Sequence, residues 1–557
     1  MYLVKIKTKN YKLFGESFEV SFNKNLNILV GDNHSGKSTV LEAINLVLRG
    51  SLDGQYLSTE KINEYLLNLN VKKDFLNEIS AGKKPVPPEI IIELHFSEDA
   101  SSDFEGTETI DQVKAKGVYT RISIRDEYLP SYNKLSKDEL KSLPLEFYDI
   151  ETKTFAGKDF VRMTSPIKSY LIDVTNNFQN ASDIAISRII KNKLEDDHKL
   201  LASQFHRNIK DSYKKQSINT EISKHLTYPN SEISIDPSHN NSWDSHLSVY
   251  IDEIPLSYSG KGNQVLLKTN VLLYNNKSDE SSIILVEEPE NHLSHSNLNK
   301  LVSEIQNKCI DKQIIITSHS SFVANKLNLG NLILLNKNNL VYFNKLNETS
   351  SKKDTEDFFE KLPGYDTLRV VLAKAVILVE GDADELCVQK FYKNKTGKLP
   401  IEDGVEIISV NNSYRRFLDI LDPLKFKVAV ILDSDDRSIS LNKEVGEFVG
   451  KQDNKIKFFF EENDVELEYL YTNKDQKTII LNKNTLEPLI LKYNTKDKLS
   501  ILLGENFNTD LETVRYMIEN KTKTALKIFT DETSSITAPK YIENAIDYII
   551  DQNGPKE

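Results

Sequence analysis

A glycine-rich run that ends in lysine and serine has the most specific chemistry in this sequence. The run Gly31–Ser38 follows the apolar segment Asn25–Val30 and precedes residues 38–48, whose apolar positions have helical spacing. Glycines let backbone N–H groups approach phosphates, and the N-terminus of a helix favours negative charge. We expect Lys37 to reach the β- and γ-phosphates of a nucleoside triphosphate and Ser38 to bind Mg²⁺. The predicted nucleotide-binding residues of this loop also include Asn33, Gly36 and Thr39.

Two later apolar segments end in polar residues that suit the same site. Residues 282–286 predict a buried strand that leads into Glu287 and Glu288. We expect Glu287 to hold Mg²⁺ and Glu288 to polarise the attacking water, although an acidic helix cap is the alternative for this segment alone. Gln313–Thr317 predicts a second buried strand, beyond which His319 could contact the γ-phosphate.

Between the run Gly31–Ser38 and these two segments lies a second glycine-rich turn, Ser259–Gln264, which precedes an apolar helical pattern. A glycine-rich helix start is suited to an anion. We therefore predict that it contributes nucleotide contacts from Ser259, Gly260 and Gly262.

Acidic residues also follow two apolar segments in the second half of the chain. Glu380 follows residues 375–379, with Asp384 one helical turn later, and Asp433 and Asp435 follow another apolar run. Carboxylates at the carboxyl ends of neighbouring parallel strands converge, and oxygen ligands favour Mg²⁺ or Mn²⁺. Two such ions can activate a water and stabilise the leaving oxygen in phosphodiester cleavage. Helix capping is the alternative role for either group alone.

The order of these motifs resembles known families. Four motifs in this order resemble the ABC-type ATPase heads of SMC and RecF proteins. They are the P-loop Gly31–Ser38, the glycine-rich helix start, Glu287-Glu288-Pro289, and His319. Glutamate followed by Asp-x-Asp resembles the Toprim domain. An ABC head followed by Toprim is similar to the OLD (overcoming lysogenization defect) family, which includes the Gabija nuclease subunit and retron-associated nucleases. The resemblance implies an ATP-regulated, Mg²⁺-dependent (or Mn²⁺-dependent) DNA endonuclease that acts in anti-phage defence.

The same resemblance implies further residues and partners. Glu468 is the expected additional metal ligand, with Glu466 as the alternative, and Lys521, or else Lys523, is the expected catalytic lysine. A lysine there could stabilise transition-state charge, whereas a solvated helix face is the alternative. ABC-type heads pair across subunits, so a homodimer or larger homo-oligomer is implied, with DNA as substrate. The possible second protein is helicase-like, or a reverse transcriptase with its RNA–DNA product.

Two departures from the ABC pattern affect the expected rate. The first acid is Glu287 where many ABC proteins carry aspartate, and the turn at Ser259–Gln264 is looser than a standard signature. We therefore expect slow turnover, with ATP acting as a conformational ligand. The Q-loop is not placed, and Gln55 is its candidate.

The expected fold class is α/β, in two parts. Residues 1–343 predict an ABC-type, SMC/RecF-like head, and within it residues 165–226 predict a helical insertion and candidate dimerisation arm. An ordinary helical layer of the same domain is the alternative. Residues 344–368 are expected to form a linker, and residues 369–557 a Toprim α/β domain with a C-terminal helical segment.

Composition limits the class of protein. The 557 residues are 39% apolar, and the net charge of −12 argues against a protein that coats nucleic acid over its whole surface. A local basic track is still compatible with that charge. No apolar run could cross a bilayer or serve as a signal peptide, so we expect a cytoplasmic protein without membrane contact. Cys309 and Cys387 are expected to be buried thiols.

Two rival functions follow from the same motifs. One is an ATP-gated DNA sensor or clamp of the RecF/SMC type whose second acidic cluster is inactive. Against it, the cluster is complete and no heptad pattern long enough for an extended arm is visible. The other is topoisomerase-like strand passage, for which no one of the 24 tyrosines stands out.

Overall fold

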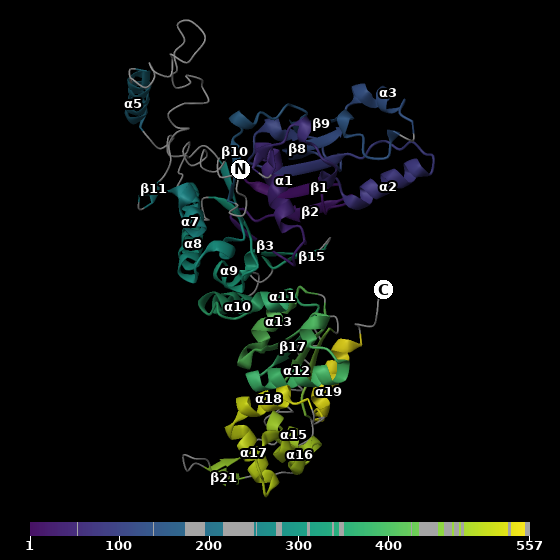
Figure 1. Cartoon of the computed structure of the whole chain (residues 1–557), viewed down its shortest axis with the longest axis vertical. Helices are drawn as coiled ribbons and strands as arrows, with labels where there is room; N and C mark the ends of the chain where they lie inside the picture. The colour runs from purple at the N-terminus through teal and green to yellow at the C-terminus, as the bar shows by residue number, and fades with distance from the viewer. Residues whose placement is uncertain are drawn as a thin grey trace, which may run out of the picture. The chain divides into compact units, whose positions relative to one another are not determined.

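The chain forms two compact units, each described here by itself (Figure 1). Unit 1 comprises Met1–Leu327 and Asn331–Tyr342, and unit 2 comprises Asn328–Gly330 and Phe343–Glu557. The computed structural model describes residues 1–52, 54–136, 139–172, 195–214, 250–251, 253–273, 281–308, 312–336, 339–344, 350–424, 426–433, 455–461, 470–472, 478–480, 484–532 and 536–551. None of the helices in these ranges is long and apolar enough to span a membrane.

A six-stranded sheet of order β10-β13-β14-β3-β15-β16 positions the phosphate-binding loop in unit 1. Its strands are β10 (Ile167–Ile172), β13 (Ser281–Glu287), β14 (Gln313–Thr317), β3 (Leu26–Val30), β15 (Leu332–Asn336) and β16 (Asn339–Tyr342). All neighbouring pairs are parallel except β15 with β16. Every residue of β3 and β14 is buried, which is the pattern of strands covered on both faces.

Four helices of unit 1 follow strands or turns of this sheet. They are α1 (Lys37–Arg49), α7 (Lys261–Leu273), α8 (His295–Lys308) and α9 (Ser321–Lys326). Ten of the thirteen α1 residues are buried, so this helix packs against neighbours on most of its surface. Helices α7 and α8 lie side by side (Figure 1).

An antiparallel sheet of order β2-β1-β6-β8-β7, with β9 beside β8, completes unit 1. Its strands are β2 (Phe18–Ser21), β1 (Leu3–Lys9), β6 (Ile90–Phe96), β8 (Ala115–Ile124), β7 (Glu105–Gly106) and β9 (Tyr148–Thr154). Alternate residues such as Ile6, Ile92 and Val118 enter the hydrophobic core, because successive side chains point to opposite faces. The remaining short elements of unit 1 are β4 (Ser51–Leu52), β5 (Gln55–Tyr56), α2 (Leu69–Ser80), α3 (Leu129–Tyr132), β11 (Tyr250–Ile251) and β12 (Ile254–Pro255).

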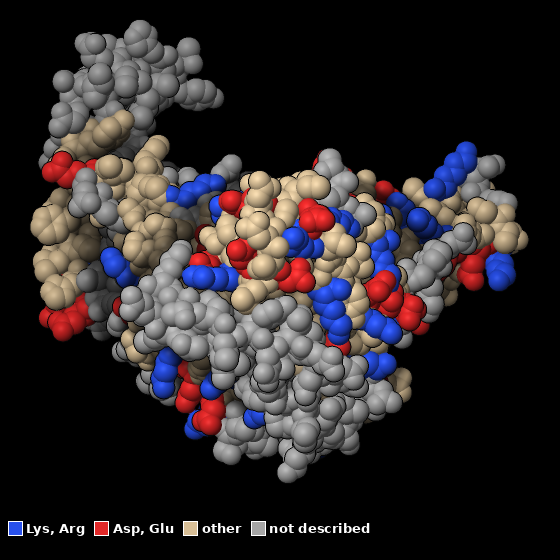
Figure 2. Space-filling view, turned by 90° about the horizontal axis from the view of Figure 1, so that it is seen from below, with Lys and Arg blue, Asp and Glu red and all other residues tan. Residues whose placement is uncertain are grey.

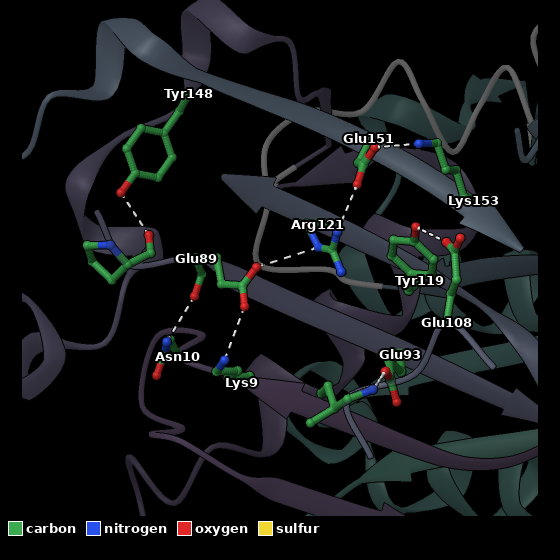
Figure 3. Close-up of polar contacts among 12 residues, drawn as sticks. Lys9, Asn10, Glu89, Glu93, Glu108, Tyr119, Arg121, Tyr148, Glu151 and Lys153 are labelled. Carbon is green, nitrogen blue, oxygen red and sulfur yellow. Dashed lines mark hydrogen bonds and ion pairs between the residues drawn. The ribbon is translucent and has the colours of Figure 1, made fainter. Parts of the chain in front are cut away.

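The other face of the antiparallel sheet carries a ladder of ion pairs (Figure 3). Glu89 accepts from Lys9 at 3.1 Å and lies 3.6 Å from the Arg121 guanidinium. Arg121 reaches Glu151 at 3.4 Å, and Glu151 accepts from Lys153 at 2.7 Å. Each of these five side chains is about one-third exposed or more, so the ladder pairs surface charges across neighbouring strands.

The structure corrects one expected boundary in unit 1. Residues 165–226 were expected to be a helical insertion, but residues 167–172 are β10, a parallel neighbour of β13 in the central sheet. The Ile167–Ile172 segment alternates buried and partly exposed residues, which is the period of a strand. Helix α5 (Asp196–Lys214) does lie in the expected insertion. Residues 173–194 and 215–249 lie outside the described residues.

Unit 2 is built on a parallel sheet of order β18-β17-β19-β20. Its strands are β18 (Val405–Ser409), β17 (Ala375–Val379), β19 (Val428–Ile431) and β20 (Ile456–Phe459). The described helices around it are α12 (Asp382–Thr396), α13 (Tyr414–Leu421), α15 (Leu486–Tyr493), α16 (Lys496–Leu503), α17 (Asp510–Glu519), α18 (Lys521–Thr530) and α19 (Lys540–Ile550). A short antiparallel pair, β21 (Leu470–Thr472) with β22 (Thr478–Ile480), completes the unit.

The segment expected to be a linker is largely helical. Within residues 344–368 the structure has α10 (Ser350–Lys361), and α11 (Thr367–Val371) begins at its end. Phe359 is fully buried and contacts Phe417 edge-to-face, with ring centroids 5.3 Å apart. The polar composition of the segment suggested a linker, but the helix is docked by the buried Phe359 ring and by the Thr355 hydroxyl, which donates to Asp419 at 2.7 Å.

Candidate functional site

The phosphate-binding loop connects β3 to α1 and depends on glycine at both of its ends. Gly36 has a left-handed backbone (φ 102°), and a Cβ there would lie 2.6 Å from the Phe14 ring. A Cβ on Gly31 would lie 2.3 Å from the Leu335 carbonyl oxygen. Close packing therefore excludes side chains at both positions. Of the other residues predicted here, Asn33 is exposed, Ser38 is half-buried and Thr39 is buried.

The ammonium group of Lys37 is folded back on this loop. Its Nζ donates to the carbonyl oxygens of Gly31 at 2.9 Å and Asp32 at 3.0 Å. Burial lowers the pKa of Lys37, and the carboxylates of Glu288 and Asp32, followed by Glu290 and Glu287, act in the opposite direction. Lys37 therefore lies in the electrostatic field of the predicted magnesium and catalytic carboxylates.

The carboxylate of Glu288, after β13, lies next to the imidazole of His319, after β14. Glu287 pairs with Thr317 in the parallel register, which brings the two strand ends to the same edge. The Nε2 atom of His319 lies 3.3 Å from Oε1 of Glu288. Glu288 has a left-handed backbone (φ 38°), which is uncommon for a residue other than glycine, and its N–H donates to the Thr317 carbonyl at 3.1 Å.

Two neighbours of Glu288 were not predicted as site residues. Asn291 Nδ2 donates to Oε2 of Glu288 at 2.6 Å. Glu290 Oε1 accepts from the backbone N–H of His319 at 2.6 Å and from Oγ of Ser318 at 2.9 Å. Both residues follow the Glu-Glu-Pro motif directly, but their hydrogen bonds reach residues whose proximity depends on the pairing of β13 with β14.

The glycine-rich turn before α7 is closed by its own side chains. Ser259 Oγ donates to the Leu256 carbonyl at 2.8 Å, and Gln264 Nε2 donates to the Ser259 carbonyl at 3.0 Å. Gly260 has open space where a Cβ would be, and Gly262 lies in the first turn of the helix. The turn thus presents its backbone, as a contact for an anion requires.

In unit 2, Glu380 and Asp433 lie at the same edge of the parallel sheet. Leu378 of β17 pairs with Val430 of β19, and each predicted acid follows its strand within three residues of that pair. Both carboxylates are half-buried. The crevice at the carboxyl ends of parallel strands is where open α/β sheets bind ligands.

Asp384 has a structural contact as well as an electrostatic one. Its Oδ2 accepts from the Gly381 N–H at 2.9 Å, so it caps the start of α12, which was the alternative reading of this residue. Burial, together with the nearby Glu487 carboxylate, raises the pKa of Asp384 to about 6. Asp384 and Glu487 therefore share a region of negative charge.

Glu487 is the acidic residue of this site that the sequence analysis missed. Its side chain on α15 is 3% exposed, and Oε1 lies 3.5 Å from Nζ of Lys521. Within the described part of the chain its other oxygen, Oε2, is buried without a hydrogen-bond partner. A lone carboxylate in the apolar helix Leu486–Tyr493 was the available signal, since buried acids are uncommon unless they are paired or bind a cation.

The structure distinguishes the two candidate lysines of α18. Lys521 pairs with Glu487, and although burial lowers its pKa, the carboxylates of Glu487, Asp433 and Asp384 produce a net rise. Lys523 instead donates to the Tyr516 hydroxyl at 3.0 Å. Lys521 is thus the lysine of the acidic cluster.

The carboxylate oxygens of this cluster are suitable ligands for a divalent cation such as Mg²⁺. Glu487 Oε2 is a buried oxygen that has no hydrogen-bond partner among the described residues. Among the described residues, no three His, Cys, Asp or Glu side chains are grouped closely enough to hold an ion together. Two predicted ligands, Asp435 and Glu468, and the alternative Glu466 lie outside those residues. The described carboxylates thus form part of a donor set.

Comparison with protein families gives two matches. Residues 1–324 match the AAA ATPase domain family, and residues 371–435 match the TOPRIM domain of overcoming lysogenization defect protein-like proteins. Comparison with curated proteins finds no match.

Several solved structures are similar to parts of the chain. The SMC head domain from Thermotoga maritima is 15% identical, covering 61% of this chain and 99% of that chain, with a TM-score of 0.28. The C-terminal region of the Burkholderia pseudomallei OLD protein is 17% identical, covering 33% of this chain and 99% of that chain, with a TM-score of 0.24. The corresponding region of the Xanthomonas campestris pv. campestris OLD protein is 20% identical, covering 32% of this chain and 96% of that chain, with a TM-score of 0.22.

Proposed function

This chain belongs to the AAA ATPase domain family and carries an OLD-like Toprim domain, and on that premise we propose that it is an ATP-regulated, divalent-metal-dependent DNA endonuclease. The two domains make it an ATPase of nuclease type. We propose three further properties: that the chain cleaves DNA, that cleavage depends on Mg²⁺ or Mn²⁺, and that ATP controls it.

The acidic cluster of unit 2 is the observation that carries the proposal. Glu380 and Asp433 end adjacent parallel strands, and the half-buried Asp384 and the buried Glu487 interact electrostatically with the same lysine, Lys521, as Asp433 does. Lys521 is the cation that interacts with this cluster in the described residues. A concentration of carboxylates in a partly buried site is unfavourable unless cations offset it.

Each residue then has a defined role. Bound divalent cations would activate a water and stabilise the leaving oxygen of a phosphodiester. Glu380, Asp384, Asp433 and Glu487 would each supply oxygen ligands as part of a larger donor set, to which we add Asp435 from the sequence pattern and Glu468 from the family resemblance. Lys521 Nζ donates toward the charge that develops on the phosphate, and its contact with Glu487 fixes its position.

The nucleotide site regulates this centre in our proposal. The loop backbone and Lys37 would hold the phosphates of ATP, with Ser38 and Glu287 on Mg²⁺. Glu288, oriented by its contact with His319, would polarise the attacking water. The turn at Ser259 presents its backbone outward, which supports pairing with the nucleotide site of a second copy of this chain.

DNA as substrate requires contact with phosphates but no uniformly basic surface. On the face shown in Figure 2, Lys and Arg are mixed with Asp and Glu among the described residues. We therefore propose that DNA is held by local lysines near the acidic cluster, as expected for a chain with a net charge of −12. We further propose a role in anti-phage defence, in which a helicase-like protein or a reverse transcriptase with its RNA–DNA product is the possible partner.

The test is cleavage of supercoiled plasmid with Mg²⁺ or Mn²⁺, with and without ATP. We expect nicked or linear products from the wild-type chain and a loss of at least about 100-fold in Asp433→Asn, because a metal ligand is removed. Asp497→Asn, at an exposed position on α16, is the matched control and should cleave like the wild type. Intact plasmid in every condition, with ATP hydrolysis retained, would instead support the ATP-gated sensor or clamp.

A further inference from the structure

The two loops that carry Glu288 and His319 are joined by a third carboxylate, that of Glu290. One of its oxygens, Oε1, accepts both from the His319 backbone N–H at 2.6 Å and from Ser318 Oγ at 2.9 Å. Ser318 is fully buried, and its own N–H donates to the Leu29 carbonyl on β3 at 3.1 Å. The Glu290 side chain therefore ties the loop after β13 to the loop after β14 at a point fixed against the core of the sheet.

Asn291 orients the other partner. Its Nδ2 holds Oε2 of Glu288 at 2.6 Å, which turns Oε1 of the same carboxylate toward His319 at 3.3 Å. The Glu288 backbone is left-handed, a conformation that persists in a non-glycine residue when the surrounding structure holds it. Two sets of hydrogen bonds hold this conformation. The Glu288 N–H donates to Thr317, and Asn291 donates to the Glu288 carboxylate.

We propose that Glu290 and Asn291 are positioning residues that set the distance and orientation between Glu288 and His319 for ATP hydrolysis. Glu290 fixes the backbone that carries His319, and Asn291 fixes the carboxylate of Glu288. The proposal deepens the ATPase half of the proposed function and rests on it. The side chains of Glu290 and Asn291 bind Glu288, Ser318 and the His319 backbone, so each acts through its neighbour.

Two substitutions of Glu290 distinguish the effect of its negative charge from the effect of its hydrogen bonds. In the described part of the chain its second oxygen, Oε2, is buried and has no hydrogen-bond partner. In Glu290→Gln the amide oxygen can keep both accepted hydrogen bonds, and the amide nitrogen takes the place of that oxygen. Glu290→Ala removes both hydrogen bonds and leaves the Ser318 hydroxyl and the His319 N–H without an acceptor, so it is the more severe change.

The test separates ATP binding from turnover. In full-length Glu290→Ala we expect kcat for ATP hydrolysis to fall about 10- to 100-fold, because a misplaced catalytic pair loses rate steeply, while Kd for ATP stays within about twofold. Glu290→Gln should recover most of the lost kcat, and Asn291→Ala should lower kcat about tenfold at unchanged Kd. Glu78→Ala, an exposed position on α2, is the control and should match the wild type.

Amide hydrogen exchange gives a readout that does not need activity. The Ser318–Val323 segment should exchange about tenfold faster in Glu290→Ala, whereas Glu290→Gln and Asn291→Ala should protect it like the wild type. Unchanged exchange and unchanged kcat in Glu290→Ala would overturn the proposal. A wild-type chain that hydrolyses no ATP would overturn the ATPase part of the proposed function, and exchange alone would then decide whether Glu290 holds the His319 loop.

Discussion

The acidic clusters of the two units satisfy their charges by different means. In unit 1, Glu288 and Glu290 accept hydrogen bonds from Asn291, Ser318 and the His319 backbone. In unit 2, Glu487 has one oxygen near Lys521 and another that is buried without a partner in the described residues, and burial raises the pKa of the neighbouring Asp384. Each cluster has one buried carboxylate oxygen, Glu290 Oε2 or Glu487 Oε2, without a hydrogen-bond partner in the described part of the chain. The two clusters differ in that hydrogen bonds from its own loops orient the first, whereas the second has the ammonium group of Lys521 as its charge partner.

This difference indicates whether the carboxylates of each site are oriented by the protein alone or depend on a bound cation. A carboxylate held by several donors is oriented before any ligand arrives, so unit 1 should bind ATP in a site whose catalytic groups are already placed. A carboxylate buried beside other carboxylates gains stability when a cation binds. The following predictions test that contrast, from the largest expected effect to the smallest.

The largest effect is expected at Lys37, which is buried in the phosphate-binding loop. Lys37→Ala should weaken ATP binding about 100-fold, because charge-assisted hydrogen bonds to phosphate are each worth about 1.5–3 kcal/mol. Titration with a fluorescent ATP analogue measures this. The stabilisation of unit 2 by Mn²⁺ should be unchanged, and a common loss of both would show that the two clusters are one coupled site.

The next effect is expected from removing the cation of unit 2. Lys521→Ala leaves the buried Glu487 carboxylate unpaired, and because the Lys521 side chain is 52% exposed the free energy of unfolding should fall by only about 1–2 kcal/mol. Chemical denaturation without divalent cations measures it. The double variant Lys521→Ala/Glu487→Gln should recover most of the loss, and additive losses would argue against a direct interaction.

A smaller and opposite effect is expected from divalent cations. Addition of Mn²⁺ or Mg²⁺ at about ten times Kd should stabilise the wild-type chain by about 1.4 kcal/mol and raise the thermal transition of unit 2 by about 3 °C. Chelation with EDTA should reverse the shift, as followed by scanning calorimetry. In Glu487→Gln the shift should shrink, whereas Glu290→Gln in unit 1 should keep it in full.

The smallest effect is expected where both partners of each ion pair are exposed. Lys153→Ala, in the ladder on the antiparallel sheet, should change the free energy of unfolding by less than about 0.5 kcal/mol. Urea denaturation measures it. A loss as large as that of Lys521→Ala would mean that burial does not distinguish the unit 2 cluster from an ordinary surface network.

The strands and loops of both sites were predictable from the sequence because their signals are local. An apolar run followed by glycine or acid marks β3, β13, β17 and β19, and the structure places Glu288 beside His319 and Asp433 near Lys521. The linker prediction failed at α10, because the buried Phe359 and Thr355 dock this otherwise polar helix.

The missed residues depend on contacts across long sequence separations. Glu487 lies 103 residues after Asp384, and the two meet because α15 packs in the same core as α12. Likewise β10 belongs to the central sheet through its pairing with β13, which begins more than a hundred residues later. Glu487 has a local signal, as a lone carboxylate in an apolar helix, but neither that signal nor the sequence of β10 indicates which distant residues each one contacts.

The strand order of the central sheet also determines when the sheet can form during synthesis of the chain on the ribosome. β3 ends at Val30, whereas the strands on either side of it, β14 and β15, begin at Gln313 and Leu332. At about 5–20 residues per second, a ribosome takes roughly 15–60 s to synthesise the intervening chain. Throughout that interval β3, whose residues are all buried in the folded protein, lacks both of its neighbouring strands. A nascent chain arrested before Thr317 should therefore be found with chaperones or in aggregates, although it already contains the whole phosphate-binding loop.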